Sequence, residues 1–465
     1  MKHRLVWFTL WSRYQVVIVL FMLFAPAMVC AEESAWQAGA AAVDITPTAP
    51  MWLAGYASRD HVSEGTIHPL WVKALALQDG QGHRAVIVTS DVLGFPRAMS
   101  DRMCARLQKN LGLARADIML NSSHTHSGPV IQDSLMCMYP LDAAGLEAVR
   151  QETARIEDAV VGAGERAFAA LRPARLSSGA GVVRFAVNRR NNAEAEVPGL
   201  NELKGPVDHS VPVLLAAGED GAPIAVLFGY ACHSTVLAGY QWCGDYPGFA
   251  QIEVEKAHPG AVALFAAGCG ADINPLPRRS VELARQYGRE LAFAVEEALA
   301  DTMKPLDAAL STRYAETELQ LAPAPERAHF EEVAAKAAPY LKNAATEQLR
   351  ELDAGRPLRG SYPYCVQLWR VGGQSMVALG GEVVVDYAVT IKRMLGREAF
   401  VFGFSNDLMS YIPSLRVLKE GGYEGDTSQL EYGMPAKWTE DVEARILGTV
   451  RVLATDVGVE VKAVE

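Results

Sequence analysis

The sequence predicts an α/β protein with large mixed sheets flanked by helices and a metal site at the carboxyl ends of strands. Short apolar runs alternate with segments of helical period along most of the chain. Several runs are uninterrupted, as in strands that are buried on both faces. Polar residues follow the ends of these runs, where the loops of such sheets form sites. With 465 residues, 50% hydrophobic and 21% charged, the chain can bury a large core.

The first 31 residues stand apart from this pattern. Basic residues precede a short apolar run, Val16–Ala31, and two glutamates follow it. This order is typical of a secretory signal peptide cleaved after Ala31, which leaves a catalytic domain over 35–465. An uncleaved N-terminal anchor is the alternative, but the run is short for a spanning helix and contains Pro26. We therefore expect export to the periplasm or the exterior.

Charge and cysteine content narrow the functional class. Loss of the basic leader changes the net charge from −11 to −14, and an acidic protein is a poor partner for nucleic acid. Six cysteines remain, irregularly spaced and without a CxxC pair, which excludes a zinc ribbon. An oxidising compartment would allow one or two disulfides among them, and the sequence does not fix which cysteines would pair. The sequence predicts no oligomeric state.

The expected elements follow in order. A short strand over 41–46 leads into a Pro-rich loop, and two strands within 68–94 flank the turn Asp79–Gly82. Further strands are expected within 116–129, 225–235 and 261–275, each ending in polar or Gly-rich residues. Helices are expected over 97–113, within 244–260 and over 280–300. Residues 323–356 are predicted to be helical and to lie outside the alternation of strands and helices. A hairpin and a helix are expected over 364–395, and a last core strand and loop over 398–414. Residues 439–454 are expected to form a helix that precedes a short final strand.

The stretch "NSSHTHSGPV", Asn121–Val130, carries two histidines at the end of a predicted strand. Residues two apart in an extended segment point to the same side. His124 and His126 could therefore both bind one metal, or one could bind metal and the other substrate. A glycosylation sequon at Asn121 is a weaker interpretation, since the stretch follows a buried strand, and an ordinary turn is the third.

Other candidate ligands also follow predicted strands. His233 ends "AVLFGYACH", Glu382 follows "SMVALGG" and Tyr411 follows "FGFSNDLMS". Histidine nitrogens and carboxylate oxygens are the usual ligands of catalytic zinc, which lowers the pKa of a bound water to about 7. Taken singly, each has a structural interpretation: a core histidine, an acid at a helix N-terminus, or a packed tyrosine.

Four of these elements together resemble the neutral/alkaline ceramidase family. They are "NSSHTHSGP", "YACHS", "LGGEVVVDY" and "SNDLMSYIPSLRVLKEGGYEG", in the family's order and approximate spacing. The segments "VDITPTAPMWLAGYASR", "HPLWVKALAL" and "TSDVLG" are also similar to that family's N-terminal catalytic domain. The resemblance covers about residues 38–455.

The resemblance implies a zinc-dependent amidohydrolase that cleaves ceramide-like lipids, at a membrane surface, into a fatty acid and a sphingoid base. The implied Zn²⁺ ligands are His124, His233, Glu382 and Tyr411. The implied catalytic residues at the carbonyl oxygen are His126, Arg189 and Tyr423. A proton for the leaving nitrogen would travel through Glu382 or His126.

Three departures from the family bear on the substrate. In "GADINP", Gly270–Pro275, Asp272 is retained but Asn274 stands in place of a serine. Residues 131–142 replace a Gly-rich continuation, and loops at strand ends set substrate choice. No segment corresponds to the immunoglobulin-like C-terminal domain of larger members. The alternatives are therefore the same scaffold acting on a non-lipid amide or ester, and a non-catalytic metal-binding relative.

Overall fold

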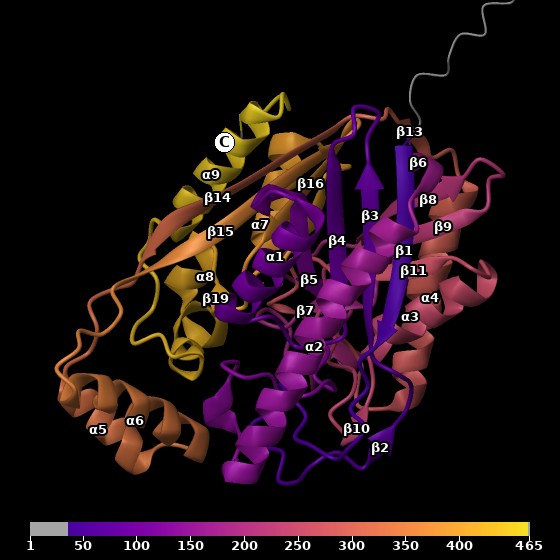
Figure 1. Cartoon of the computed structure of the whole chain (residues 1–465). Helices are drawn as coiled ribbons and strands as arrows, with labels where there is room; N and C mark the ends of the chain where they lie inside the picture. Colours follow the sequence, from indigo (N-terminus) through magenta and orange to yellow (C-terminus); the bar gives the residue numbers. More distant parts are fainter. Residues whose placement is uncertain (1–35, 464–465) are drawn as a thin grey trace, which may run out of the picture. The chain divides into compact units, whose positions relative to one another are not determined.

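Two β-sheets packed face to face form the centre of the structure (Figure 1). The computed structural model describes residues 36–463. The larger sheet has the spatial order β11 (Val262–Ala267), β9 (Pro223–Tyr230), β8 (Ser210–Gly218), β6 (Arg172–Val182), β1 (Trp36–Asp44), β3 (Trp71–Gln78), β4 (Arg84–Ser90) and β5 (Ile118–Ser122), with β13 (Lys304–Leu306) beside β6. The second has the order β14 (Leu310–Gln320), β15 (Ser361–Val371), β16 (Gln374–Leu379) and β18 (Phe400–Phe402).

Short paired strands lie in the loops near the sheet ends. The pairs are β2 (Gly65–Thr66) with β10 (Gln241–Trp242), β7 (Ala186–Asn188) with β12 (Ile273–Pro275), and β17 (Glu382–Val383) with β19 (Tyr411–Ile412). The α-helices are α1 (Arg97–Leu111), α2 (Ala143–Ala169), α3 (Asp245–Ala257), α4 (Val281–Ala300), α5 (Arg327–Lys336), α6 (Pro339–Asp353), α7 (Val385–Leu395), α8 (Leu415–Glu420) and α9 (Val442–Asp456). The predicted α/β class with mixed sheets is confirmed.

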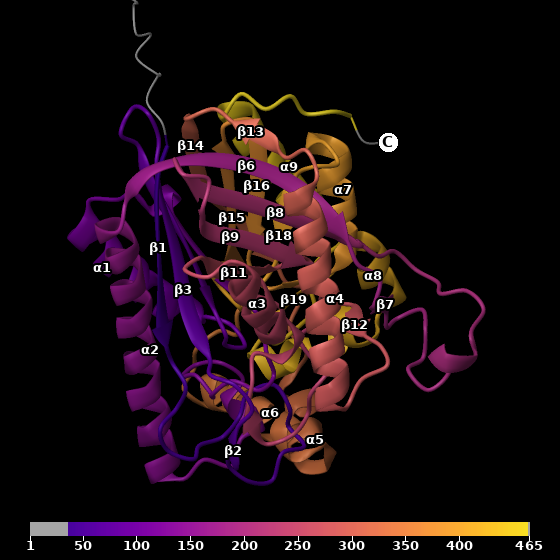
Figure 2. The ribbon, with the colours of Figure 1, turned by 90° about the vertical axis from the view of Figure 1, so that its right-hand side faces the viewer.

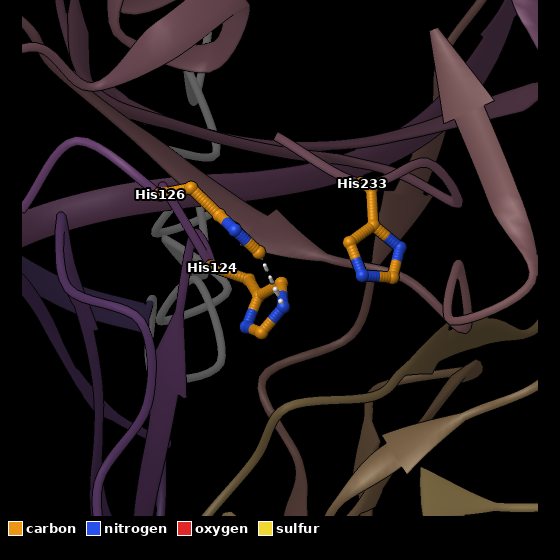
Figure 3. A group of neighbouring side chains, drawn as sticks. All are labelled: His124, His126 and His233. Atoms are coloured by element: carbon orange, nitrogen blue, oxygen red, sulfur yellow. Dashed lines mark hydrogen bonds between the residues drawn. The ribbon is translucent and has the colours of Figure 1, made fainter. Parts of the chain in front are cut away.

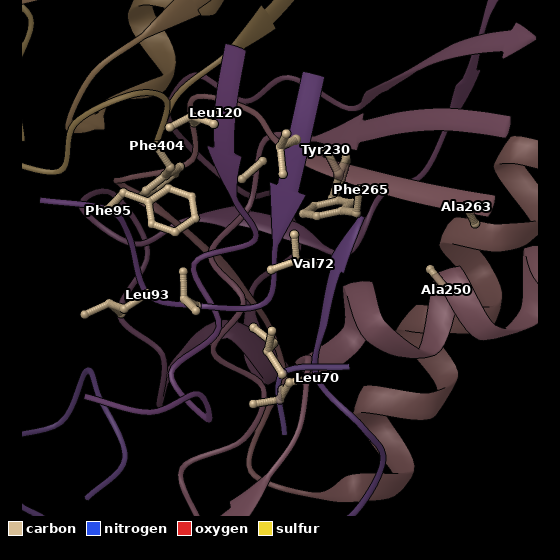
Figure 4. Packing of buried hydrophobic residues seen from close by; sticks show 14 of the residues in the cluster. Leu70, Val72, Leu93, Phe95, Leu120, Tyr230, Ala250, Ala263, Phe265 and Phe404 are labelled. Atoms are coloured by element: carbon tan, nitrogen blue, oxygen red, sulfur yellow. The ribbon is translucent and has the colours of Figure 1, made fainter. Parts of the chain in front are cut away.

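Side-chain alternation along the strands builds four layers. In β3, Val72 and Ala74 face a core shared with α1–α4, whereas Leu75 faces the second sheet. The outer face of the second sheet packs against α7 and α9. Figure 4 shows the first of these cores, where Val72 and Phe265 lie among other large apolar side chains. The predicted apolar strands β4, β5, β9 and β11 are buried on both faces, as expected, but a second sheet rather than helices covers one face.

The larger sheet folds back on itself, and this brings the site together. β1 and β6 pair only through Trp36–Ala38 and Arg172–Ala174. Figure 2 shows β6, β8 and β9 running across the direction of β1 and β3. The ends of β5 and β11 consequently meet: the Asn121 side chain accepts from the Ala267 amide at 2.8 Å and donates to the Gly403 carbonyl at 2.8 Å. Asn121 is fully buried, which agrees with the sequence argument against a glycosylation site at this residue.

Most predicted elements are present, with three exceptions. β1 begins at Trp36, earlier than the predicted start at residue 41. The predicted final strand is wrong: Gly458, with φ +72°, turns the chain after α9, and 457–463 form no strand. The helix α2 and the strands β6, β8 and β14 have no counterpart among the predicted elements.

The predicted helical segment outside the alternation is the pair α5–α6, which stands apart at the lower left of Figure 1. Residues 321–360, which contain it, are inserted between Gln320 and Ser361, and these two are paired neighbours in β14 and β15. The pair is therefore an insertion at the end of a β-hairpin.

Two sequence expectations concern export. The signal peptide lies outside the described residues. Within 36–463, no helix combines the length and apolar character that a membrane span requires. In the same range, the six cysteines from Cys104 to Cys365 form no disulfide, and all but Cys137 are buried in the interior. The disulfides that an oxidising compartment would allow are therefore not formed among these residues.

Candidate metal centre

Three imidazoles converge where the ends of β5 and β9 meet. Figure 3 shows His124 and His126, from the loop after β5, facing His233, from the loop after β9. One ring nitrogen from each lies within 4.8 Å of the others. Loop contacts hold the two segments together: the Ser234 hydroxyl donates to the Ser123 carbonyl at 2.6 Å.

The histidines converge by a different geometry from the predicted one. β5 ends at Ser122, and His124 has a left-handed backbone with φ 56°. The segment is therefore not extended, and the two rings are nearly perpendicular, with an interplanar angle of 81°. They meet because the chain turns, with the two Nε2 atoms 3.2 Å apart.

Backbone carbonyls fix the tautomers of two of the histidines. His124 Nδ1 lies 2.6 Å from the Leu93 carbonyl oxygen, and His233 Nδ1 lies 2.7 Å from that of Gly270. Since a carbonyl oxygen only accepts, each Nδ1 carries the proton and each Nε2 presents a lone pair. A histidine that ligates a metal usually has its other nitrogen held in this way. His126 Nδ1 has no hydrogen-bond partner among the described residues.

Glu382 faces the two lone pairs. Its Oε2 lies 3.4 Å from His124 Nε2 and 3.2 Å from His233 Nε2, and all three side chains are buried. Within residues 36–463, Glu382 Oε2 and His233 Nε2 have no hydrogen-bond partner. Acceptor atoms that face one another in a buried site need a proton or a cation between them. This donor set of imidazole nitrogens and a carboxylate fits a divalent metal ion.

Burial and mutual proximity shape the charges. Burial, with the nearby Arg189, lowers the pKa of His233 to about 4. Burial, then His124 and His233, holds the pKa of His126 well below its usual value. Burial raises the pKa of Glu382, but the adjacent histidines outweigh it and hold that pKa well below the usual value. Burial thus favours the neutral imidazole at His126 and His233, and the neutral imidazole is the form that binds metal.

A tyrosine–arginine group adjoins this centre. Tyr411 pairs with Glu382 in the parallel strands β19 and β17. Arg189, just after β7, donates from Nη2 to the Tyr411 hydroxyl at 3.2 Å and from Nε to Glu424 at 2.7 Å. Tyr423 packs against Tyr411, with ring centroids 5.1 Å apart, and its hydroxyl donates to Glu431 at 3.2 Å. All residues proposed from the sequence therefore belong to one contiguous region.

A family model described as neutral/alkaline non-lysosomal ceramidase, N-terminal, matches residues 36–275. This chain belongs to the neutral/alkaline ceramidase family. Neutral ceramidase of Pseudomonas aeruginosa is 29% identical over 267 residues, which are 55% of this chain and 39% of that protein. Neutral ceramidase A of Dictyostelium discoideum is 28% identical over 249 residues, 51% of this chain and 34% of that protein. The chain thus matches less than half the length of these curated relatives.

The crystal structure of the Pseudomonas aeruginosa neutral ceramidase shares the fold. It aligns with 93% of this chain and 76% of its own, with a TM-score of 0.71 and 21% sequence identity. The fold match therefore extends well beyond residue 275, where the family model ends.

The position at which this ceramidase-family chain departs from the expected serine lies beside Arg189. Asn274, in β12, accepts from Arg189 Nη1 at 3.4 Å. Asp272 accepts from the backbone amide of Val385, at the start of α7, at 2.8 Å and from Asn188 at 3.0 Å. Asn274 is thus next to the candidate site, whereas Asp272 connects β7 to α7.

Sequence reasoning missed several residues that support the site. Tyr432 donates a short hydrogen bond to Glu382 Oε1. Arg59 donates to the His126 carbonyl at 2.7 Å, and Gly55 lies against the His126 ring. Glu424 binds both Arg189 and Arg190. The unusual density of aromatic and acidic residues in "GGYEGDTSQLEYG" is the signal that could have drawn attention to Tyr432 and Glu424.

Proposed function

We propose that this chain is a zinc-dependent amidohydrolase that cleaves an N-acyl amide, with a ceramide-like sphingolipid as the leading substrate. The observation that carries the proposal is the arrangement of His124, His233 and Glu382. Two Nε2 lone pairs face a carboxylate oxygen that has no hydrogen-bond partner among residues 36–463, and all three lie in a buried site. Kinship with neutral ceramidases supports the amide substrate.

His124, His233, Glu382 and Tyr411 would hold the ion. We favour these over a three-histidine site because carbonyls fix Nδ1 of His124 and His233, whereas Nδ1 of His126 has no hydrogen-bond partner in the described part of the chain. When bound, zinc supplies a Lewis acid that polarises a carbonyl and makes water a stronger nucleophile at neutral pH.

The remaining residues would act on the amide. His126 can carry a proton on Nε2, which faces the metal-binding nitrogens, and donate it to the substrate oxygen. Tyr423 would donate a second hydrogen bond by turning its hydroxyl from Glu431, and Arg189 would add positive charge through Tyr411. Such donors contribute a few kcal/mol each, about 3–4 kcal/mol in favourable cases.

Of the two candidates that could return a proton to the leaving nitrogen, we favour His126 over Glu382. Glu382 Oε1 accepts a hydrogen bond from Tyr432, and Oε2, which faces the two histidine nitrogens, would bind the ion. Burial lowers the pKa of His126 and keeps the imidazole neutral, and its Nε2 faces the metal-binding nitrogens, where it can exchange a proton with the reacting groups.

The decisive experiment combines metal analysis with hydrolysis of a labelled ceramide and a short N-acyl amino acid. We expect about one zinc ion per chain and turnover of the ceramide. His233→Ala should lose both, whereas His258→Ala, at a histidine that binds Glu296 instead, should retain both. A metal-free wild-type protein would overturn the proposal. Turnover of the amino acid alone would replace the lipid substrate, and full zinc without turnover would indicate a binding relative.

Export is a separate proposal that rests on the N-terminal sequence. We propose that cleavage after Ala31 releases a catalytic domain that begins near residue 35 and acts in the periplasm or outside the cell. Mass spectrometry of the mature protein tests this: a mass that retains residues 1–31 would favour the uncleaved anchor.

A further inference from the structure

The two oxygens of Glu382 have different surroundings. Oε2 faces the Nε2 atoms of His124 and His233 and has no hydrogen-bond partner in the described chain. Oε1 instead accepts a short hydrogen bond from the Tyr432 hydroxyl. The carboxylate is thereby held in one rotation, with a single oxygen directed at the imidazoles.

The neighbourhood of Tyr432 is well fixed. The tyrosine ends the short helical turn η5 (Gln429–Tyr432). At one end of that turn, Gln429 Nε2 donates to the Tyr411 carbonyl at 3.3 Å. Just past the other end, Gln348 of α6 donates to the Gly433 carbonyl at 3.1 Å. The Tyr432 ring also packs edge-on against Tyr411, with centroids 6.1 Å apart. The contacts on both sides of η5 therefore hold the Tyr432 hydroxyl in place beside Glu382.

We infer that Tyr432 is a positioning residue for the metal: it holds Glu382 Oε1 so that only Oε2 is available as a ligand. The inference rests on the proposed zinc site. In this role the Tyr432 hydroxyl acts only through the carboxylate, and Tyr432→Phe keeps the ring that packs against Tyr411.

Loss of the hydroxyl has a defined physical consequence. Glu382 Oε1 would become a buried, unpaired charged acceptor, which is costly. The carboxylate would then rotate, or offer both oxygens to the ion. Removal of a hydrogen-bond partner from a metal ligand typically lowers metal affinity by about 10- to 100-fold.

Tyr432→Phe tests the inference against a matched control. The control is Tyr287→Phe, which removes another buried hydroxyl, one that donates to the Pro277 carbonyl at 2.6 Å. Zn²⁺ affinity is measured by competition with a chelator. We expect affinity to fall about 10- to 100-fold in Tyr432→Phe and to stay at the wild-type value in Tyr287→Phe. The visible spectrum of the Co²⁺ form should change only in Tyr432→Phe, since a purely structural defect would not alter ligand geometry.

The outcomes separate this inference from the proposed function. A wild-type protein without stoichiometric zinc would overturn the zinc site itself. Wild-type zinc affinity and an unchanged Co²⁺ spectrum in Tyr432→Phe would overturn only the role of Tyr432. If the metal-free phenylalanine variant does not fold, Tyr432→Met, whose flexible side chain fills the same space without a hydroxyl, takes the same test and the same expectation.

Discussion

At the scale of single residues, the backbone of His124 connects geometry to chemistry. Its left-handed conformation, φ 56°, costs about 1–2 kcal/mol for a non-glycine residue. That turn lets Nδ1 reach the Leu93 carbonyl and directs Nε2 toward Glu382. Strain of this kind persists where the surroundings fix it, often at functional sites. The two histidines of one motif thus acquire different surroundings and different proposed roles.

His126→Ala distinguishes these roles. If His126 serves the substrate, the variant should keep wild-type zinc content while kcat/KM falls about 100- to 1000-fold, as for loss of one oxyanion donor. His124→Ala should instead lose zinc. The measurements are metal analysis and steady-state hydrolysis. Loss of zinc in His126→Ala would favour the three-histidine site.

Gly55→Ala perturbs His126 without replacing it. Gly55 has φ +98°, and a Cβ there would lie 2.3 Å from His126 Nδ1. We expect zinc binding to persist and kcat/KM to fall about 100-fold, because small displacements of a reacting group are costly.

Gly82→Ala is the matched control for that variant. Gly82 has a similar φ of +86°, but nothing lies within 4 Å of its added Cβ. The backbone cost of about 1–2 kcal/mol should be alike in the two variants, so only the clash with His126 differs. Equal activity in both variants would contradict the proposed role of His126.

At the scale of elements, the best-predicted helices and strands are those whose own hydrophobic pattern indicates their type. β5 and β9 are apolar runs that were predicted as strands, and the histidines that follow them lie in the loops at the strand ends, as expected. The ligand roles of Glu382 and Tyr411 came from family resemblance, because two-residue strands such as β17 and β19 have no periodicity. The contact of Tyr432 with Glu382 could not be predicted from either source, since it joins residues 50 positions apart through tertiary packing alone.

The segment between β18 and β19 contains a buried acid with a testable pH dependence. Burial raises the pKa of Asp407 to about 7. Two groups partly offset this rise: the Tyr362 hydroxyl, which donates to Oδ2 at 2.7 Å, and the positive charge of Arg97. The unfolded value is about 3.9. Since the folded pKa is the higher, this group destabilises the fold increasingly as pH rises from about 4 to 7, by at most about 4 kcal/mol.

Asp407→Asn removes that titration and retains an acceptor for Tyr362. We expect the variant to melt at a higher temperature than the wild type at pH 8 and at nearly the same temperature at pH 4.5. Thermal unfolding of the metal-free proteins at the two pH values measures this. A difference that is equal at both would show that Asp407 does not titrate in this range.

At the scale of the whole molecule, the folded-back sheet explains why the site exists. Only three residue pairs join β1 to β6, so the two halves of the sheet can diverge and their carboxyl ends can converge. Buried contacts then hold the two halves of the sheet together, including the hydrogen bond from the Ala267 amide of β11 to the Asn121 side chain of β5. No local pattern encodes such a bend, because it depends on where pairing stops between strands that are far apart in sequence. The architecture, rather than any one motif, brings His124 and His233 together.

The α5–α6 insertion offers a test at this scale. Gln320 and Ser361 are already paired, so residues 323–358 could be replaced by a short Asn-Gly turn that suits a hairpin. Few residues of α5 and α6 are buried, namely Phe330, Ala344, Ala345 and Gln348. The sandwich should therefore fold without the insertion, with a melting temperature within a few degrees of the wild type.

The site should nevertheless respond to this deletion. Gln348 supports Gly433, next to Tyr432, so its loss should loosen the segment that holds Glu382. We expect zinc affinity to fall about tenfold, in the direction of Tyr432→Phe, and Gln348→Ala to reproduce part of the loss. Chelator competition and thermal unfolding provide the two readings. Unchanged zinc affinity in a folded deletion variant would mean that η5 is braced by the sandwich alone, and that the insertion has no part in holding the metal carboxylate.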